Sequence, residues 1–232
     1  HMIVVHRHGA MYVYAFLKAP VNNIELPMGI KTSSTLVVCE QLAALAEPAL
    51  SVDELQQTDQ QLVRAAMDHD RVIQELFQST TVLPLHFGTS FLSQAHLMSH
   101  LRKKQRYYCD QLQKLDDKAE YLVKLLPHNY SAEVEPAEKA GCSYIFPSKN
   151  RYETQVDYRE QQKQEFNDLW QFLQAQPCEI VQGKRNTDNV ERLFLLLQKS
   201  QEGWFRQLLG THTAHCWNIH IGEALPPYHF VS

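Results

Sequence analysis

The sequence predicts an α+β protein of two domains, and three observations support this prediction. Short apolar segments rich in β-branched and aromatic residues alternate with longer segments of helical periodicity along the chain. The alternation restarts after a polar run, KLDDK, at residues 114–118. The chain has 232 residues, 44% of them hydrophobic and 21% charged, which is ordinary for a globular protein with a real core. We therefore expect an N-terminal domain over residues 11–117 and a C-terminal domain over residues 118–232.

The N-terminal domain is expected to be mixed α+β and to begin with two strands and a helix. Residues 11–17, MYVYAFL, are apolar and aromatic and predict a strand. Residues 35–46 begin as a strand, but their alanine-rich second half is ambiguous. A helix is expected to follow as far as Phe77, because Thr58 and Gln61 form a capping box before a stripe of apolar residues at helical spacing.

A third strand and a second helix complete the expected order β-β-α-β-α. Residues 80–87, TTVLPLHF, predict the strand, and Pro84 within it lacks an amide donor, which favours an edge or a bulge. The second helix is expected to start near Ser90 or Ser93 and to run to about Leu115. Apolar residues recur along it at alternating spacings of three and four, with a single glutamine as the interruption.

From residue 118 onward the expected order is β-α-β-β-α-β, which is the ferredoxin-like topology of four antiparallel strands with two helices on one face. Gly210 is expected to end the second helix as its C′ residue, and residues 127–143 are expected to form a loop. The expected strands are residues 119–126, 178–182, 190–197 and 215–221, and the expected helices are residues 152–174 and 202–209.

An extended tail, GEALPPYHFVS, closes the chain. Pro226 and Pro227 restrict its backbone to an extended path. Tyr228, Phe230 and Val231 alternate with a histidine and so form an apolar face. We expect this face to pack within the chain, against the first domain, rather than to act as an external binding motif.

Composition and charge disfavour several classes of function. The formal charge is −4 and neither half of the chain has an excess of basic residues, which disfavours nucleic-acid binding. The eight glycines are scattered singly, whereas a phosphate-binding loop needs them clustered. The five cysteines include no CxxC pair, so no cysteine-based zinc or redox site is expected, and a reducing, cytoplasmic location fits best. No apolar run is long enough to span a bilayer, so no membrane association is expected.

The sequence carries none of the common catalytic motifs GxSxG, GxxxxGKS/T, GxGxxG and HExxH. We therefore predict a protein that is not an enzyme and that uses no cofactor or metal. His96 and His100 lie four residues apart, with His86 as a conceivable third ligand, but no carboxylate stands in register with the pair. His69 lies on an apolar stripe, where a buried, hydrogen-bonded structural histidine is favoured over a general base.

Four blocks of sequence resemble the gas vesicle protein GvpF/GvpL family, in order and spacing, along about the whole chain. The GvpF form is the more similar of the two. Two positions depart from the family pattern, since His86 stands where members often have arginine and Leu225 where they often have tryptophan. No role of a cation at position 86 is therefore carried over. The four blocks are residues 11–16 (MYVYAF), 68–77 (DHDRVIQELF), 81–89 (TVLPLHFGT) and 226–231 (PPYHFV).

The resemblance implies a non-catalytic, minor structural or accessory protein of gas vesicles, the hollow protein shells that give buoyancy to aquatic microbes. The family is associated with vesicle assembly and with binding the small, apolar shell protein GvpA, which would limit the aggregation of GvpA. The resemblance also implies two α+β domains, the second ferredoxin-like, and a location at the gas vesicle. Other accessory proteins of the vesicle are further expected partners, and the chain alone is expected to be monomeric.

A protein that holds an aggregation-prone subunit needs an exposed apolar patch or an open strand edge. We expect that surface where the segments LPLHFG and PPYHFV come together. The candidate protein-interaction residues are Pro84, Phe87, Gly88, Tyr228 and Phe230. Two alternatives from other classes stay open, a ferredoxin-like small-ligand sensor and a metal-dependent hydrolase built on the histidines.

Overall fold

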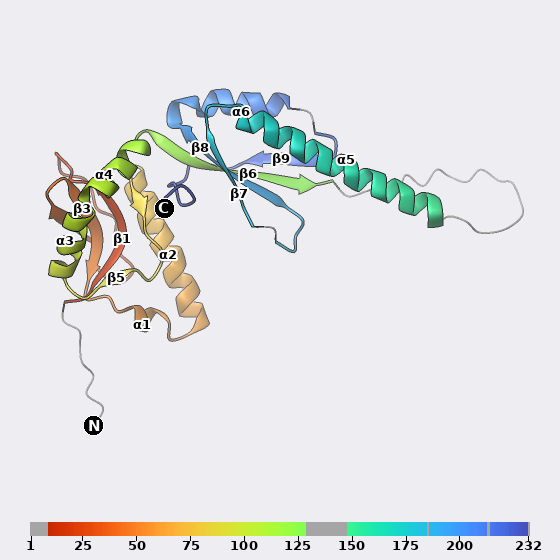
Figure 1. The fold of residues 1–232 in the computed structure, drawn as a ribbon. Coiled ribbons are helices and arrows are strands. Elements are labelled where there is room, and N and C mark those ends of the chain that lie inside the picture. Colours follow the sequence, from red (N-terminus) through yellow and green to blue (C-terminus); the bar gives the residue numbers. More distant parts are fainter. Residues whose placement is uncertain (1–8, 129–147, 185, 213, 232) are drawn as a thin grey trace, which may run out of the picture. The chain divides into compact units, whose positions relative to one another are not determined.

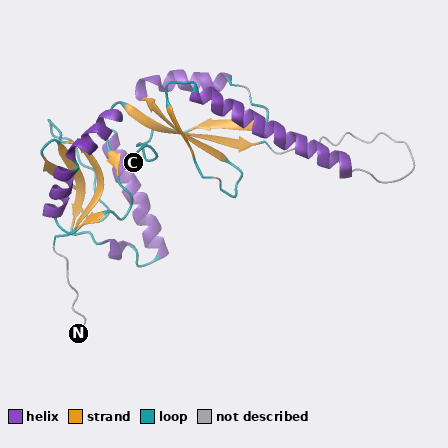
Figure 2. Ribbon diagram, viewed as in Figure 1, coloured by secondary structure: helices purple, strands orange, loops and turns teal. Residues whose placement is uncertain are grey.

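The computed structural model describes residues 9–128, 148–184, 186–212 and 214–231, which divide into two compact units (Figure 1). Unit 1 comprises residues 9–120 together with the tail at residues 224–231, and unit 2 comprises the described residues between 121 and 223. The tail, which the sequence analysis grouped with the C-terminal domain, thus belongs with the first unit. Both units combine helices with antiparallel strand pairs (Figure 2), so the chain is α+β.

Unit 1 is built on a sheet of strand order β2-β3-β1-β4, with β5 also paired to β1. Its strands are β1 (Met11–Lys18), β2 (Thr35–Cys39), β3 (Leu42–Pro48), β4 (Leu83–Pro84) and β5 (Ser90–Phe91). Its helices are α1 (Val52–Leu55), α2 (Asp59–Phe77), α3 (Gln94–Lys103) and α4 (Gln105–Lys114).

Strand β1 is the centre of unit 1, and it confirms the strand predicted for residues 11–17. It pairs antiparallel with β3, β4 and β5. Every residue from 11 to 17 is buried, because α2 and α4 also pack against this strand. An apolar and aromatic strand with no polar alternation is what burial on both faces requires.

Residues 35–48 form a β-hairpin, in which β2 and β3 are joined by a turn at Glu40 and Gln41. Glu40 has a positive φ of 56° at the first position of this turn. The alanine-rich half that the sequence left ambiguous is therefore strand β3. Its alanines lie between β1 and β2 with no exposed surface, so sheet pairing outweighs their intrinsic preference for a helix.

Helix α2 begins as predicted, because the Thr58 hydroxyl accepts a hydrogen bond from the backbone N–H of Gln61 at 3.2 Å. Strand β4 is only two residues long, so most of the strand expected over residues 80–87 is irregular. It lies at the edge of the sheet, as Pro84 predicts. The short pairing is extended by Leu85, whose backbone N–H donates to the carbonyl of a β1 residue at 2.9 Å.

The single helix expected from Ser90 or Ser93 to Leu115 is wrong, because the structure has two helices. Ser90 belongs to strand β5, and Ser93 is the N-cap of α3, with its hydroxyl accepting from the N–H of His96. Helix α3 ends at Lys103 with Lys104 as its C-cap, and α4 starts at Gln105, the one glutamine that interrupts the apolar seam. Compared with the structure, the predicted order β-β-α-β-α omits three features: the β2–β3 hairpin, strand β5 and the break between α3 and α4.

Unit 2 has the element order β-α-β-β-α-β and a sheet of strand order β7-β8-β6-β9. Its two helices lie over one face of the sheet (Figure 1). Its strands are β6 (Lys118–Pro127), β7 (Glu179–Gln182), β8 (Glu191–Gln198) and β9 (Trp217–Ile221). Its helices are α5 (Ser148–Gln174), a short 3-10 helix η1 (Lys199–Gln201) and α6 (Glu202–Thr211).

The end of α6 differs from the prediction. Gly210 does not end α6, because the helix continues to Thr211 and its C-cap is His212. The exposed Gly210 has no neighbour near its Cα in the direction of a side chain, so nothing forces the chain to turn there. Most of the loop expected over residues 127–143 lies outside the described residues, since residues 129–147 are not described.

The C-terminal tail packs within unit 1, as the sequence predicts. Leu225 pairs with Glu120 through two backbone hydrogen bonds, each 2.9 Å long. The Glu120 carboxylate is 1% exposed and accepts a hydrogen bond from the backbone N–H of His229 at 2.8 Å and one from its ring Nδ1 at 2.7 Å. Phe230, the next residue, is buried. A buried carboxylate therefore ties the end of the chain to the start of β6.

We predict that His229→Ala lowers the free energy of unfolding by about 1–3 kcal/mol, because a buried carboxylate loses a partner. Burial raises the pKa of Glu120, and the hydrogen bonds from His229 oppose that rise. Without the imidazole, the folded state binds a proton at Glu120 more readily than the unfolded state, so the variant gains stability as the pH falls.

Urea unfolding at several pH values measures this effect. The deficit of the variant should shrink toward acid pH, while His220→Ala, which changes an exposed histidine of β9, should cost less than about 0.5 kcal/mol. An equal loss in the two variants would contradict the assignment.

Candidate interaction surface

The histidines that the sequence offered as possible metal ligands hold separate structural positions. His100 Nε2 lies 2.7 Å from the hydroxyl of Tyr108, and His96 Nδ1 lies 2.8 Å from the hydroxyl of Ser93. Among the described residues, no group of three or more His, Cys, Asp and Glu side chains is placed to hold a metal ion. Within the same part of the chain, no helix is both long and apolar enough to cross a membrane.

His69 is the centre of a buried polar network in unit 1, which confirms that this histidine is buried and hydrogen-bonded. The ring is 1% exposed, and its Nε2 donates to the carbonyl of Leu85 at 2.9 Å. The Tyr12 hydroxyl lies 2.9 Å from the other ring nitrogen, Nδ1, and donates to it. Burial lowers the pKa of His69, so a neutral imidazole with both nitrogens engaged is the stable form.

The same network fixes the segment that carries two of the predicted interaction residues. The backbone N–H of Gly88 donates to the Tyr12 hydroxyl at 3.2 Å. Gly88 has a φ of +87°, a conformation that favours glycine. The Phe87 ring packs edge-on against the rings of Tyr12 and His69, with centroids 6.4 and 5.7 Å apart. These contacts fix the positions of Phe87 and Gly88.

Two of the five predicted interaction residues are buried, and the other three are half-buried. Pro84 and Phe230 are buried, and Phe87 is half-buried. Tyr228 is half-buried and lies beside Asp70 and Gln74 of α2. The segments LPLHFG and PPYHFV therefore both contact α2, the first through Leu85 and His69 and the second through Tyr228.

The exposed apolar side chains of unit 1 include two on the outer face of α2. Val63 and Met67 are 59% and 68% exposed, and their spacing of four residues places them on one face. Met28 is 60% exposed, and its carbonyl accepts from Arg71 at 3.2 Å. Because Arg71 lies one turn beyond Met67, the backbone of Met28 lies near this end of the helix, and we group Met28 with the two α2 residues. We call these three apolar residues, Met28, Val63 and Met67, the α2 patch.

Structural features of unit 1 flank the α2 patch on two sides. Asp70 and Gln74 continue the helical face of Val63 and Met67 toward Tyr228, so the tail forms one border. The other border is a cavity of about 590 Å³ with charged and polar walls. Its lining residues are Ile30, Lys31, Glu54, Leu55, Gln57, Gln61, Arg64, Ala65 and Asp68.

A second buried carboxylate holds the loop that carries Met28. Glu47 of β3 has no exposed surface and accepts hydrogen bonds from three successive backbone N–H groups and from the Tyr14 hydroxyl. A Cβ at Gly29 would clash with a Glu47 carboxylate oxygen and lie 2.6 Å from the backbone carbonyl of Thr32, so only glycine fits this approach. The three N–H donors belong to residues 30, 31 and 32, at 2.8, 2.9 and 2.6 Å.

Sequence reasoning did not find the α2 patch or the role of Glu47. One signal was available, because Val63 and Met67 are apolar residues that fall off the buried stripe of their helix. Helical periodicity identifies the face that is buried, and apolar residues outside it are candidates for contact with a partner.

A family model and two solved structures each match nearly the entire chain. The family model described as gas vesicle synthesis protein GvpL/GvpF matches residues 10–232. No curated protein matches the chain. The structure is similar to the crystal structure of gas vesicle protein GvpF from Anabaena sp. PCC7120, with a TM-score of 0.71, 14% identity, and coverage of 97% of this chain and 98% of that one.

A second crystal structure, of gas vesicle protein GvpF from Microcystis aeruginosa, gives a TM-score of 0.68 at 15% identity. That alignment covers 96% of this chain and 99% of the other. Identities this low show a shared fold and nothing finer.

We predict that Tyr12→Phe lowers the free energy of unfolding by about 2–4 kcal/mol, because it leaves His69 Nδ1 and the N–H of Gly88 without their partner. Urea denaturation measures the change. Tyr107→Phe, at a tyrosine with 39% of its surface exposed, is the matched control and should change stability by less than about 0.5 kcal/mol. A Tyr12→Phe variant as stable as the control would refute the structural role of the network.

Proposed function

The chain belongs to the GvpL/GvpF family of gas vesicle synthesis proteins, and from this premise we propose that it is a minor accessory protein of gas-vesicle assembly that binds the shell protein GvpA. By covering apolar surface of GvpA, it limits the aggregation of that protein before the shell forms. Its place of action is the nascent gas vesicle, where other accessory proteins are further partners.

The observation that carries this proposal is the α2 patch. Its three apolar side chains are each at least 59% exposed, on a helix whose opposite face is fixed by the His69 network. Full burial of a valine or methionine side chain contributes about 1.5–3 kcal/mol, so a partner that covers Val63 and Met67 gains useful binding energy. A rigid apolar patch with a polar border suits an apolar protein partner.

Two further parts of the proposal concern catalysis and the second unit. The role is non-catalytic, and the engagement of both His69 nitrogens in structural hydrogen bonds supports this. Unit 2 is assigned as a ferredoxin-like domain, a reading supported by its element order and its strand order β7-β8-β6-β9.

We predict that the double substitution Val63→Asp and Met67→Asp weakens GvpA binding at least tenfold, because two carboxylates would be desolvated at the contact. Co-purification of tagged protein with GvpA after co-expression, followed by titration, measures the effect. Both positions are exposed, so circular dichroism and thermal unfolding should match the unchanged protein.

Val21→Asp is the matched control, because Val21 is 98% exposed in unit 1 and lies outside the α2 patch. It should bind GvpA normally. Normal GvpA binding by the folded double variant would refute the α2 patch as the contact, and failure of the unchanged protein to bind GvpA at all would refute the proposed function.

A further inference from the structure

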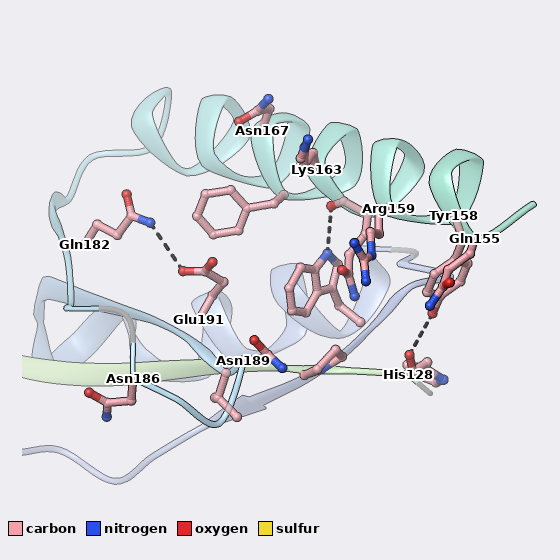
Figure 3. A pocket seen from close by; sticks show the side chains of 15 residues that line it. His128, Gln155, Tyr158, Arg159, Lys163, Asn167, Gln182, Asn186, Asn189 and Glu191 are labelled. Atoms are coloured by element: carbon pink, nitrogen blue, oxygen red, sulfur yellow. Dashed lines mark hydrogen bonds between the residues drawn. The ribbon is translucent and has the colours of Figure 1, made fainter. Parts of the chain in front are cut away.

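Unit 2 contains an open cleft beneath the middle of α5, at the end of the sheet where β6 and β7 finish and β8 and β9 begin (Figure 3). Its volume is about 870 Å³, which lies within the range of ligand-binding clefts. The function proposed above makes no use of it. The cleft is walled by α5 on one side and by the strand ends on the other.

Aromatic side chains form the middle of the cleft and are held in fixed orientations. The rings of Phe166 and Trp217 lie with centroids 6.4 Å apart. The Trp217 indole N–H donates to the carbonyl of Gln162 at 3.0 Å, which locks the ring against α5. The Tyr158 hydroxyl donates to the carbonyl of His128 at 2.8 Å. Phe166 is half-buried and so keeps ring surface open to the cleft.

Two cationic side chains line one part of the cleft, from Arg159 to the middle of its α5 wall. Arg159 and Lys163 lie four residues apart on α5, and both line the cleft. Arg159 makes no hydrogen bond or ion pair with any other residue that the structure describes. Lys163 contacts Glu160 at 2.7 Å, but both side chains are about two-thirds exposed, and such pairs are weak. Both cations are thus available to an anion.

The other end of the cleft presents hydrogen-bonding groups of a different kind. Gln182 and Glu191 line this end together with Asn167 of α5, and the Gln182 amide donates to the Glu191 carboxylate at 3.4 Å (Figure 3). A carboxamide offers both donors and an acceptor, and a carboxylate accepts from amino groups. The eight residues from Arg159 to Asn167 correspond to about 12 Å along the helix, so the two ends are well separated.

We propose that this cleft binds a nucleoside monophosphate. The phosphate contacts Arg159 and Lys163, the base lies against the Phe166 ring, and the polar edge of the base meets the carboxamide and carboxylate end. Binding through side chains needs no glycine-rich loop, which agrees with the scattered glycines of this sequence. The inference does not depend on GvpA binding.

Isothermal titration and thermal unfolding of the full chain with AMP, GMP, CMP and UMP test this inference. Adenosine, ribose 5-phosphate and inorganic phosphate serve as the separate parts of the ligand. We expect at least one nucleotide to raise the melting temperature more than any single part at equal concentration. No response to any nucleotide, or an equal response to inorganic phosphate, would overturn the proposal.

Two variants locate the site. Arg159→Gln should weaken binding of the responding nucleotide at least tenfold, because the phosphate loses a charged partner. Lys124→Gln removes an equal charge from an exposed position of β6 outside the cleft and should leave the affinity within twofold. Unchanged affinity in a folded Arg159→Gln variant would contradict the assigned site.

Discussion

The hydrogen bonds of one buried imidazole connect α2 to the sheet of unit 1. His69 connects α2 to the central strand through Tyr12 and to the segment after β4 through Leu85. Each of these groups is removed from water, so leaving any of them unpaired costs more than the bond itself contributes. The orientation of α2 is therefore fixed from its inner face, and the outward direction of Val63 and Met67 follows from it.

Two buried carboxylates extend the same principle around α2. Glu47 accepts hydrogen bonds from three backbone N–H groups of the loop that carries Met28. Glu120 accepts one from the backbone and one from the ring of His229 in the tail. The loop that carries Met28 and the C-terminal tail have little regular secondary structure. Their backbone N–H groups donate to carboxylates instead of to the carbonyls of a neighbouring strand. Apolar side chains on both borders of α2 thereby acquire defined positions, which limits the entropy lost when a partner binds.

The sequence predicts what depends on local periodicity and fails where tertiary contacts decide. The strand at residues 11–17, the cap at Thr58, the element order after residue 118 and the buried His69 follow from pattern alone. The alanine-rich strand β3 does not, because its partners are distant in sequence. For the candidate surface, the residues predicted in LPLHFG and PPYHFV are buried or half-buried, whereas the exposed Val63 and Met67 lie off the periodic stripe and were not predicted.

The central claim is that the outer face of α2, held by the His69 network, is the contact surface for GvpA. A photo-crosslinking residue placed at Met67, whose side chain is 68% exposed, tests it most directly in cells that assemble vesicles. The account predicts a covalent adduct with GvpA from position 67 and none from position 21. An adduct from position 21, or none from position 67 while GvpA still co-purifies, would contradict it.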